Sequence, residues 1–281
     1  MFVIIIEMKL NNKQGFTLIE LLVVISIISM LASIILANIN SARDRARLAA
    51  NMQFEANLVH TIGDQMVGEW KFDDGAGVAS DTSSFGNNAT AVNATWSANG
   101  GYNGKGAYIF NGSNYITIGA PSILNFSGLS SFTESAWVNT PNGGGTIFGR
   151  HTAAGDTMAT LRMGGGKLNV LLHTTNAPAG FYDFTSTGAV PLNKWVYVAV
   201  VYDGTNISFY MNGVLDSKFP ASGSINAGYS GVVLGRNTAG GEFLTGTLDT
   251  ARIYTSALTG MNIQNIYAME KPNHPDSVAL K

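Results

Sequence analysis

The chain has 281 residues, a formal net charge of −2 at pH 7 and no cysteine. The near-neutral charge gives no electrostatic case for binding nucleic acid, and the lack of cysteine excludes disulfides and thiolate metal sites. Charged residues make up 12% of the chain, against a usual share of about 25%, and there are 33 glycines. This composition fits an exported β-rich domain with many turns, whose core supplies its stability.

An apolar segment near the start of the chain predicts a membrane-spanning helix. Residues 16–39 contain no proline and one charged side chain, that of Glu20. A helix of this length would be about 36 Å long, enough to cross a hydrocarbon core of about 30 Å. The hydroxyls of Ser26, Ser29 and Ser33 are expected to bond to backbone carbonyls within the helix. A lone carboxylate in such a span is costly, so Glu20 needs a partner.

The residues before Glu20 form a distinctive pattern. Lys9 and Lys13 precede Gly15, Phe16 follows it, and Glu20 is the fifth residue after the glycine. Over residues 8–60 this pattern resembles the type IV prepilin signal shared by pilins and the pseudopilins of type II secretion. The resemblance implies that a prepilin peptidase cleaves between Gly15 and Phe16 and that the new Phe16 amine is N-methylated. It also implies that Glu20 pairs with the Phe16 amine of a neighbouring subunit, which would fix the register between subunits.

The leader defined by this signal is residues 1–15. Its first seven residues are mostly apolar, unlike a short polar prepilin leader, so Met8 is the expected true start. Basic residues lie on both sides of the span, so charge does not fix its orientation; the resemblance places the leader in the cytoplasm. Three alternatives are a secretory signal peptide, a simple membrane anchor and a buried core helix. Glu20 disfavours the first, and apolar residues all round the helix disfavour the third.

Residues 40–66 keep an amphipathic helical pattern that continues the first helix. From residue 67 to residue 270 the pattern changes to short β runs broken by glycine and asparagine, and residues 271–281 form a tail. Asn212-Gly213 and Asn111-Gly112 predict hairpin turns, because both residue types tolerate positive φ. A short helix is expected at about Thr259–Met269. The expected strands are Glu69–Asp73, Ala107–Phe110, Tyr115–Ile118, Phe132–Asn139, Thr146–Gly149, Met158–Met163, Leu168–His173, Trp195–Tyr202, Ile207–Met211, Val214–Phe219, Val232–Gly235 and Gly246–Tyr254.

The order of motifs in this region narrows the fold. GEWKFDDGAG comes first, followed by GKGAYIFNGSNYITIG, FTESAWVNT, KWVYVAVVYDGTNISFYMNGVLDS and finally GTLDTARIYTSAL. Residues 68–270 thereby resemble the laminin-G-like, concanavalin A-like jelly roll. The expected fold class is a long N-terminal transmembrane α-helix followed by an all-β antiparallel jelly-roll sandwich. This sandwich serves lectins, glycosidases, adhesins and spacers, so the fold alone does not fix the function.

Aromatic residues in the domain divide into core and loop candidates. Trp70, Trp137 and Trp195 lie in expected strands and are predicted to pack in the core. Three others lie in loop-like stretches, where their rings could stack on sugar faces; they are Trp96, Tyr182 and Tyr229.

Acidic residues in turns make calcium a candidate ligand. Asp81 lies in a turn region rich in glycine and asparagine, and Asp249 matches an acidic position typical of the jelly-roll family. The competing role of Asp249 is to bond backbone amides or Arg252 at a strand crossover. No EF-hand spacing is present, and the sequence predicts no specific ligand set.

The sequence favours a non-enzymatic protein. Glycosidases on this scaffold need two facing carboxylates, and no E-x-D-x-x-E run occurs. The four histidines lack zinc-like spacing, and no G-x-S-x-G elbow or phosphate-binding loop is present.

The expected function is therefore that of a subunit of a type IV pilus or a type II secretion-type filament, displaying the jelly roll for adhesion or for glycan or protein binding. Its expected partners are the prepilin peptidase and methylase, other pilin or pseudopilin subunits, the inner membrane, and an extracellular glycan or protein. It would cross the inner membrane once, with its head outside the cytoplasm, before reaching the cell surface. The alternative is an anchored cell-surface carbohydrate-binding module that does not assemble into fibres.

Overall fold

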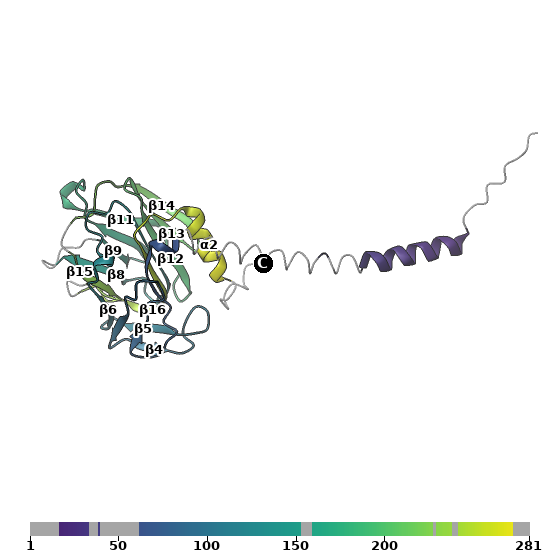
Figure 1. Cartoon of the computed structure of the whole chain (residues 1–281), viewed down its shortest axis with the longest axis horizontal. Coiled ribbons are helices and arrows are strands. Elements are labelled where there is room, and N and C mark those ends of the chain that lie inside the picture. Colours follow the sequence, from purple (N-terminus) through teal and green to yellow (C-terminus); the bar gives the residue numbers. More distant parts are fainter. Residues whose placement is uncertain are drawn as a thin grey trace, which may run out of the picture. The chain divides into compact units, whose positions relative to one another are not determined.

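The computed structural model describes residues 17–33, 39, 62–152, 159–226, 229–237 and 241–271. The chain divides into two compact units, Met1–Ala56 and Asn57–Lys281 (Figure 1). Each unit is described by itself below, and the second is called the head.

The N-terminal unit contains a helix over residues 18–33, and Ile39 is also helical. Every described side chain of this helix is exposed within the single chain. As predicted, three serine hydroxyls donate to backbone carbonyls: Ser26 to Val23 at 2.8 Å, Ser29 to Ile25 at 2.7 Å, and Ser33 to Met30 at 2.8 Å.

The expected span of residues 16–39 includes residues 16 and 34–38, which lie outside the described residues. No helix in the described part of the chain combines the length and the apolarity needed to cross a membrane. Of the expected helical continuation, residues 40–61 lie outside the described residues. Gly63–Gln65 form a short 3-10 helix, η1, and Met66 begins the first strand of the head.

The head is a sandwich of two antiparallel sheets, which we call sheet A and sheet B. Sheet A has the order β14-β13-β12-β7-β16-β5-β4, with β1 also paired to β16. Its strands are β1 (Met66–Trp70), β4 (Thr95–Ser97), β5 (Ala107–Asn111), β7 (Phe132–Asn139), β12 (Val196–Tyr202), β13 (Asn206–Met211), β14 (Val214–Pro220) and β16 (Thr245–Tyr254).

Sheet B has the order β11-β10-β9-β8-β15-β6-β3-β2. Its strands are β2 (Val78–Ala79), β3 (Ala89–Val92), β6 (Tyr115–Gly119), β8 (Gly145–Thr152), β9 (Ala159–Gly164), β10 (Lys167–Leu172), β11 (Tyr182–Ala189) and β15 (Tyr229–Leu234). Short 3-10 turns η2 (Ser122–Leu124) and η3 (Pro178–Gly180) lie in the connections. Sheet A and sheet B confirm the antiparallel sandwich predicted from the sequence.

The core lies between the two sheets and follows the alternation of the strands. In β12, Val196, Val198 and Val200 belong to the core cluster, while the side chains between them point to the other face of sheet A. Trp70 is fully buried, as predicted, and Trp137 is also buried. Trp195 is half-buried and lies just before β12, so its prediction as a strand core residue is wrong.

An ion pair also lies inside the sandwich. Glu134 of β7 and Arg150 of β8 are both fully buried, and Arg150 Nη1 lies 2.5 Å from Glu134 Oε1. The Arg150 guanidinium carbon lies 3.6 Å from the centre of the Phe126 ring, which is a cation–π contact. The core is therefore not made of apolar side chains alone.

The two predicted hairpin turns have different outcomes. Asn212 and Gly213 adopt positive φ, 49° and 77°, and join β13 to β14, which confirms the first. The second is wrong, because β5 lies in sheet A and β6 in sheet B. Asn111 N donates to Asn114 Oδ1 at 2.9 Å, so a local turn carries the chain from one sheet to the other.

Helix α2 (Gly260–Glu270) confirms the predicted C-terminal helix and covers part of the outer face of sheet A. In Figure 1 it lies beside β12, β13 and β14, on the side away from sheet B. The Tyr267 ring lies 5.7 Å from the Trp137 ring, and Trp137 Nε1 donates to Glu270 Oε2 at 2.6 Å. Arg252 bridges Glu270 and Glu69. Burial opposes the ionised form of Glu69, but the Arg252 charge lowers its pKa to about 2.

Candidate functional site

The N-terminal helix begins with a reciprocal cap. Thr17 N and Thr17 Oγ1 both donate to Glu20 Oε2 at 2.9 Å, and Glu20 N donates to Thr17 Oγ1 at 3.3 Å. This is a capping box, in which a threonine before the helix and a glutamate in its first turn satisfy each other's backbone amides. The spacing Thr-x-x-Glu, here Thr17 and Glu20, is its sequence signal, and it was not among the features predicted from the sequence. Gly15 and Phe16, the expected cleavage residues, lie outside the described residues.

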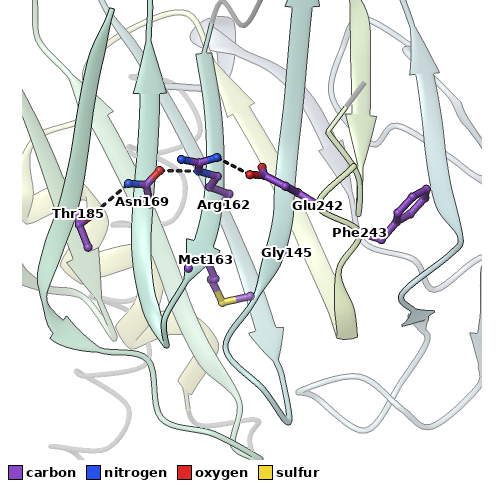
Figure 2. Close-up of a pocket in the computed structure, with 8 residues that line it drawn as sticks. Gly145, Arg162, Met163, Asn169, Thr185, Glu242 and Phe243 are labelled. Carbon is purple, nitrogen blue, oxygen red and sulfur yellow. Dashed lines mark hydrogen bonds and ion pairs between the residues drawn. The ribbon is translucent and has the colours of Figure 1, made fainter. Parts of the chain in front are cut away.

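The head carries a groove of about 380 Å³ on the outer face of sheet B. Strand alternation turns Leu161 and Leu168 into the core, so Arg162 of β9 and Asn169 of β10 point outward. Figure 2 shows the lining residues, with Phe243 beyond one end of the polar row. The groove is lined by Gly145, Arg162, Met163, Gly164, Asn169, Thr185, Glu242 and Phe243.

A row of polar side chains runs across the strands along this groove (Figure 2). Arg162 and Asn169 are cross-strand partners, as are Asn169 and Thr185. Arg162 Nε donates to Asn169 Oδ1 at 2.6 Å, and Asn169 Nδ2 donates to Asp183 Oδ1 at 2.6 Å and Thr185 Oγ1 at 2.9 Å. Arg162 Nη1 lies 2.5 Å from Glu242 Oε1. The row therefore fixes the rotamers of its own members.

Glu242 reaches the row from the connection between β15 and β16. Its backbone has a positive φ of 55°, and its carbonyl accepts from Thr146 N of β8 at 2.9 Å. This anchor holds an exposed carboxylate against the sheet. The next residue, Phe243, lies 5.7 Å from the guanidinium carbon of Arg236, which in turn lies over the Tyr115 ring at 3.8 Å.

The exposed charge of the groove is mostly negative. The side chain of Arg162 is 20% exposed, whereas those of Asp183 and Glu242 are 46% and 42% exposed. Two accessible carboxylates thus flank a cation that is mostly covered. The arrangement is therefore suited to binding through hydrogen bonds, with carboxylate oxygens as acceptors and an aromatic ring beside them.

The three predicted sugar-stacking residues lie elsewhere. Trp96 lies in β4 and not in a loop; it is half-buried, packs against the core, and its Nε1 donates to Phe72 O at 2.8 Å. Tyr182 begins β11, where its ring stacks on Phe184 at 5.4 Å. Tyr229 begins β15, and its side chain lies outside the described residues. None of the three is among the residues that line the groove.

Asp81 and Asp249, the candidate calcium ligands, hold loops in place. Asp81 accepts hydrogen bonds from Glu69 N, Ser83 N, Ser83 Oγ and Asn87 N, at 2.7–2.8 Å. No group of three or more Asp, Glu, His or Cys that could hold a metal ion occurs in the part of the chain that the structure describes. These bonds occupy the carboxylate of Asp81 and give it a structural role in the loop, which is the alternative to calcium binding.

Asp249 lies at a bulge in β16. The register with β7 shifts between Asp249 and Arg252, and Thr250 has a φ of 43°. Asp249 accepts from Tyr102 N at 3.1 Å and from Thr250 Oγ1 at 3.1 Å. This confirms the backbone-amide alternative; Arg252 instead pairs with Glu69 and Glu270. Burial raises the pKa of Asp249 to about 7.

Comparison with known families identifies both parts of the chain. Residues 110–264, more than half of the sequence, match the concanavalin A-like lectin/glucanases superfamily. Residues 10–36 match the prokaryotic N-terminal methylation motif. The chain therefore belongs to the concanavalin A-like lectin/glucanases superfamily and carries a prepilin-type methylation motif in front of that domain.

Similar individual proteins match the head in part. Human usherin is 27% identical over 146 residues, which are 50% of this chain and 3% of usherin. The binding domain of paraclostridial mosquitocidal protein 1 has a TM-score of 0.59 and 16% identity, covering 74% of this chain and 53% of that one.

A third similar structure is domain 4 of AbnA, an extracellular arabinanase from Geobacillus stearothermophilus, solved with arabinotriose. It has a TM-score of 0.55 and 21% identity, covering 72% of this chain and 98% of that domain. At these identities the two solved structures show a shared fold alone. The chain spans about half of the toxin binding domain and a small fraction of usherin.

Proposed function

We propose that the chain is a pilin-like or pseudopilin-like subunit of a type IV pilus or a type II secretion-type filament, and that its jelly roll is displayed as a binding head. The methylation motif at residues 10–36 carries the first half of this proposal, since such a motif implies processing by a prepilin peptidase. The subunit would wait in the inner membrane with its head outside the cytoplasm and would then reach the cell surface.

The N-terminal helix supports this role. Leu18, Ile19 and Met30 are 83%, 75% and 68% exposed in the single chain. Apolar side chains in such numbers need a cover of lipid or of neighbouring helices. Glu20 would pair with the Phe16 amine of the next subunit after cleavage, and its cap with Thr17 would satisfy the carboxylate before assembly.

The head would bind an extracellular carbohydrate or protein. Two structures with the same fold were solved with sugars, arabinotriose in AbnA domain 4 and N-acetylneuraminic acid in the serotype D botulinum neurotoxin domain. The groove on sheet B offers this chain a comparable role, with fixed polar side chains beside an aromatic ring. We propose binding without catalysis, because its two exposed carboxylates flank Arg162 in an open site.

Processing is tested with Gly15→Leu, which places a bulky side chain at the expected cleavage site. The variant should stay at precursor mass in the membrane fraction, while a matched leader variant, Asn11→Leu, should be processed like the wild type. Mass spectrometry of both proteins, expressed with the native prepilin peptidase, distinguishes the two forms. Normal cleavage of Gly15→Leu before Phe16 would refute the proposed site.

The anchored, non-assembling module remains the second candidate, since an exposed apolar helix equally suits a permanent anchor. Shearing of cells separates the two. A filament subunit leaves with the sheared filaments, whereas an anchored module stays with the membranes after the same treatment.

A further inference from the structure

We infer that the outer face of sheet B binds an extended, uncharged saccharide chain that lies across the strands from Phe243 to Phe181. This inference rests on the proposed binding function of the head and names the ligand class and the surface. It follows from the exposed charges of the groove, from the Phe243 ring that lines it and the Phe181 ring farther along the same face, and from the place of the groove on a sheet face.

Hydrogen-bonding capacity in the groove favours a ligand that donates. Of the charged side chains here, those of Asp183 and Glu242 are more exposed than that of Arg162, and their carboxylate oxygens only accept hydrogen bonds. Asp183 Oδ2 lies 3.8 Å from Arg162 Nη2, beyond hydrogen-bond distance, so this oxygen keeps capacity for a ligand hydroxyl. Sugar hydroxyls are donors of the required kind.

The same charges disfavour an acidic glycan. The cation at the centre of the groove, Arg162, is 20% exposed and lies between Glu242 and Asp183. A further guanidinium, that of Arg236, lies 5.7 Å from the Phe243 ring and over the Tyr115 ring. A carboxylated sugar would therefore meet two exposed carboxylates before it met an accessible cation, which is repulsive.

A second aromatic pair lies beyond the polar row. The Phe181 ring stacks on His173 at 5.3 Å and is 42% exposed. Leu172 points into the core, and so does Tyr182 by its pairing with Leu172, so the alternation places His173 and Phe181 on the outer face.

The two aromatic ends are several strands apart. Phe181 immediately precedes β11, while the backbone of Phe243 packs on Gly145 of β8. Strands β11, β10, β9 and β8 are consecutive in sheet B, so the strip of surface from Phe243 to Phe181 crosses three strand spacings, roughly 14 Å. Phe181 also lies four residues before Thr185, the row member on β11, so the strip runs diagonally and extends roughly 13 Å along the strands as well. That length suits several linked sugar rings better than one.

The position of the strip also disfavours an extended peptide. Peptides that extend a sheet need a free strand edge with unpaired backbone groups. The strip crosses the face of sheet B, where the backbones of β9 and β10 are already paired on both sides. A ligand there is held by side chains, as a sugar chain would be.

The test is isothermal titration calorimetry of sugars into the full chain held in detergent micelles. Neutral arabino-, gluco- and galacto-oligosaccharides of two to six rings are compared with oligogalacturonate and sialyllactose. The inference expects at least one neutral series to bind more tightly as rings are added and the acidic sugars to bind at least tenfold more weakly. Preference for an acidic sugar, or no binding by any neutral series, would overturn it.

Variants tie the binding to the strip. Asp183→Asn removes a charged acceptor and should weaken binding by about tenfold or more. Phe243→Ala and Phe181→Ala should each weaken it several-fold through loss of ring contact. The matched control Asp64→Asn changes an exposed carboxylate of η1 and should leave binding unchanged. Unchanged binding in all three strip variants, with tryptophan fluorescence confirming that they are folded, would place the ligand elsewhere and reject the inference.

Measuring processing, shear release and sugar binding on the same protein tests this inference and the filament proposal separately. If the protein is processed and released by shear but prefers acidic sugars, the filament-subunit proposal stands and the uncharged-saccharide inference is rejected. Neutral sugar binding by a chain that is never cleaved before Phe16 would do the reverse.

Discussion

Stability of the head should fall as the pH rises from about 4 to 7, and Asp249 should account for part of that loss. The folded head keeps this carboxyl protonated up to about pH 7, because burial raises its pKa from 3.8 to about 7. The unfolded chain releases the same proton near pH 4. Stability provided by the protonated form is therefore present at low pH and is lost as the pH rises through this window.

The size of the effect follows from the shift. One pKa unit corresponds to 1.36 kcal/mol, so the full window is worth up to about 4 kcal/mol. Burial also raises the pKa of Glu134 above its usual range, so this group changes stability in the same direction. Its contribution cancels when wild type is compared with an Asp249→Asn variant, which cannot titrate at this position.

Urea unfolding of both proteins at several pH values between 4.5 and 7.5 measures this difference. All four tryptophans lie in the head, so their fluorescence reports its unfolding and not that of the N-terminal helix. The free energy of unfolding of wild type relative to Asp249→Asn should decrease by about 2 kcal/mol or more over this range. A difference that stays constant with pH, or grows in favour of wild type, would refute the assignment of a raised pKa to Asp249.

Three further predictions concern turns and caps. Gly213→Ala should destabilise the head by about 1 kcal/mol more than Gly165→Ala in urea unfolding. Both glycines have positive φ, but only a Cβ at 213 would lie close to another group, 2.9 Å from the Tyr267 ring. Equal losses of stability in the two variants would contradict this contact. Thr17→Val should speed hydrogen exchange at the start of the N-terminal helix and Thr17→Ser should not, since the cap is worth about 1 kcal/mol; exchange rates that match wild type in Thr17→Val would argue against the cap. Glu20→Ala should be processed normally but recovered poorly in sheared filaments, and normal recovery would count against a pairing role.

Most of the sandwich could be predicted from the sequence because its strands are short runs rich in β-branched and aromatic residues, separated by glycine and asparagine. Phe132–Asn139 is bounded as expected, and the Asn212-Gly213 turn is set by two residues alone. Strand β11 was missed because it lies at the edge of sheet B, with polar side chains on its exposed face. The turn at Asn111-Gly112 shows the limit of local signals, since it reverses the chain but does not determine which sheet receives the next strand.

The groove could not be predicted in the same way. Arg162 and Asn169 are ordinary polar positions in alternating strands, and nothing in their local sequence marks them as a pair. Glu242 joins them through a long-range contact, an ion pair with a residue 80 positions away. The prediction that Trp96 lies in a loop was wrong because its glycine-rich neighbours are typical of loops, whereas Trp96 lies in a three-residue strand. Sites assembled from several strands need the register, which the sequence does not show.

The N-terminus of the protein isolated from its native membrane or filaments tests the central proposal most directly. Tandem mass spectrometry of the N-terminal peptide should find a chain that begins at Phe16 with an N-methylated amine. A chain that still carries Gly15, or one cleaved within or after residues 17–39, would contradict the assignment of this protein to the pilin-like subunits.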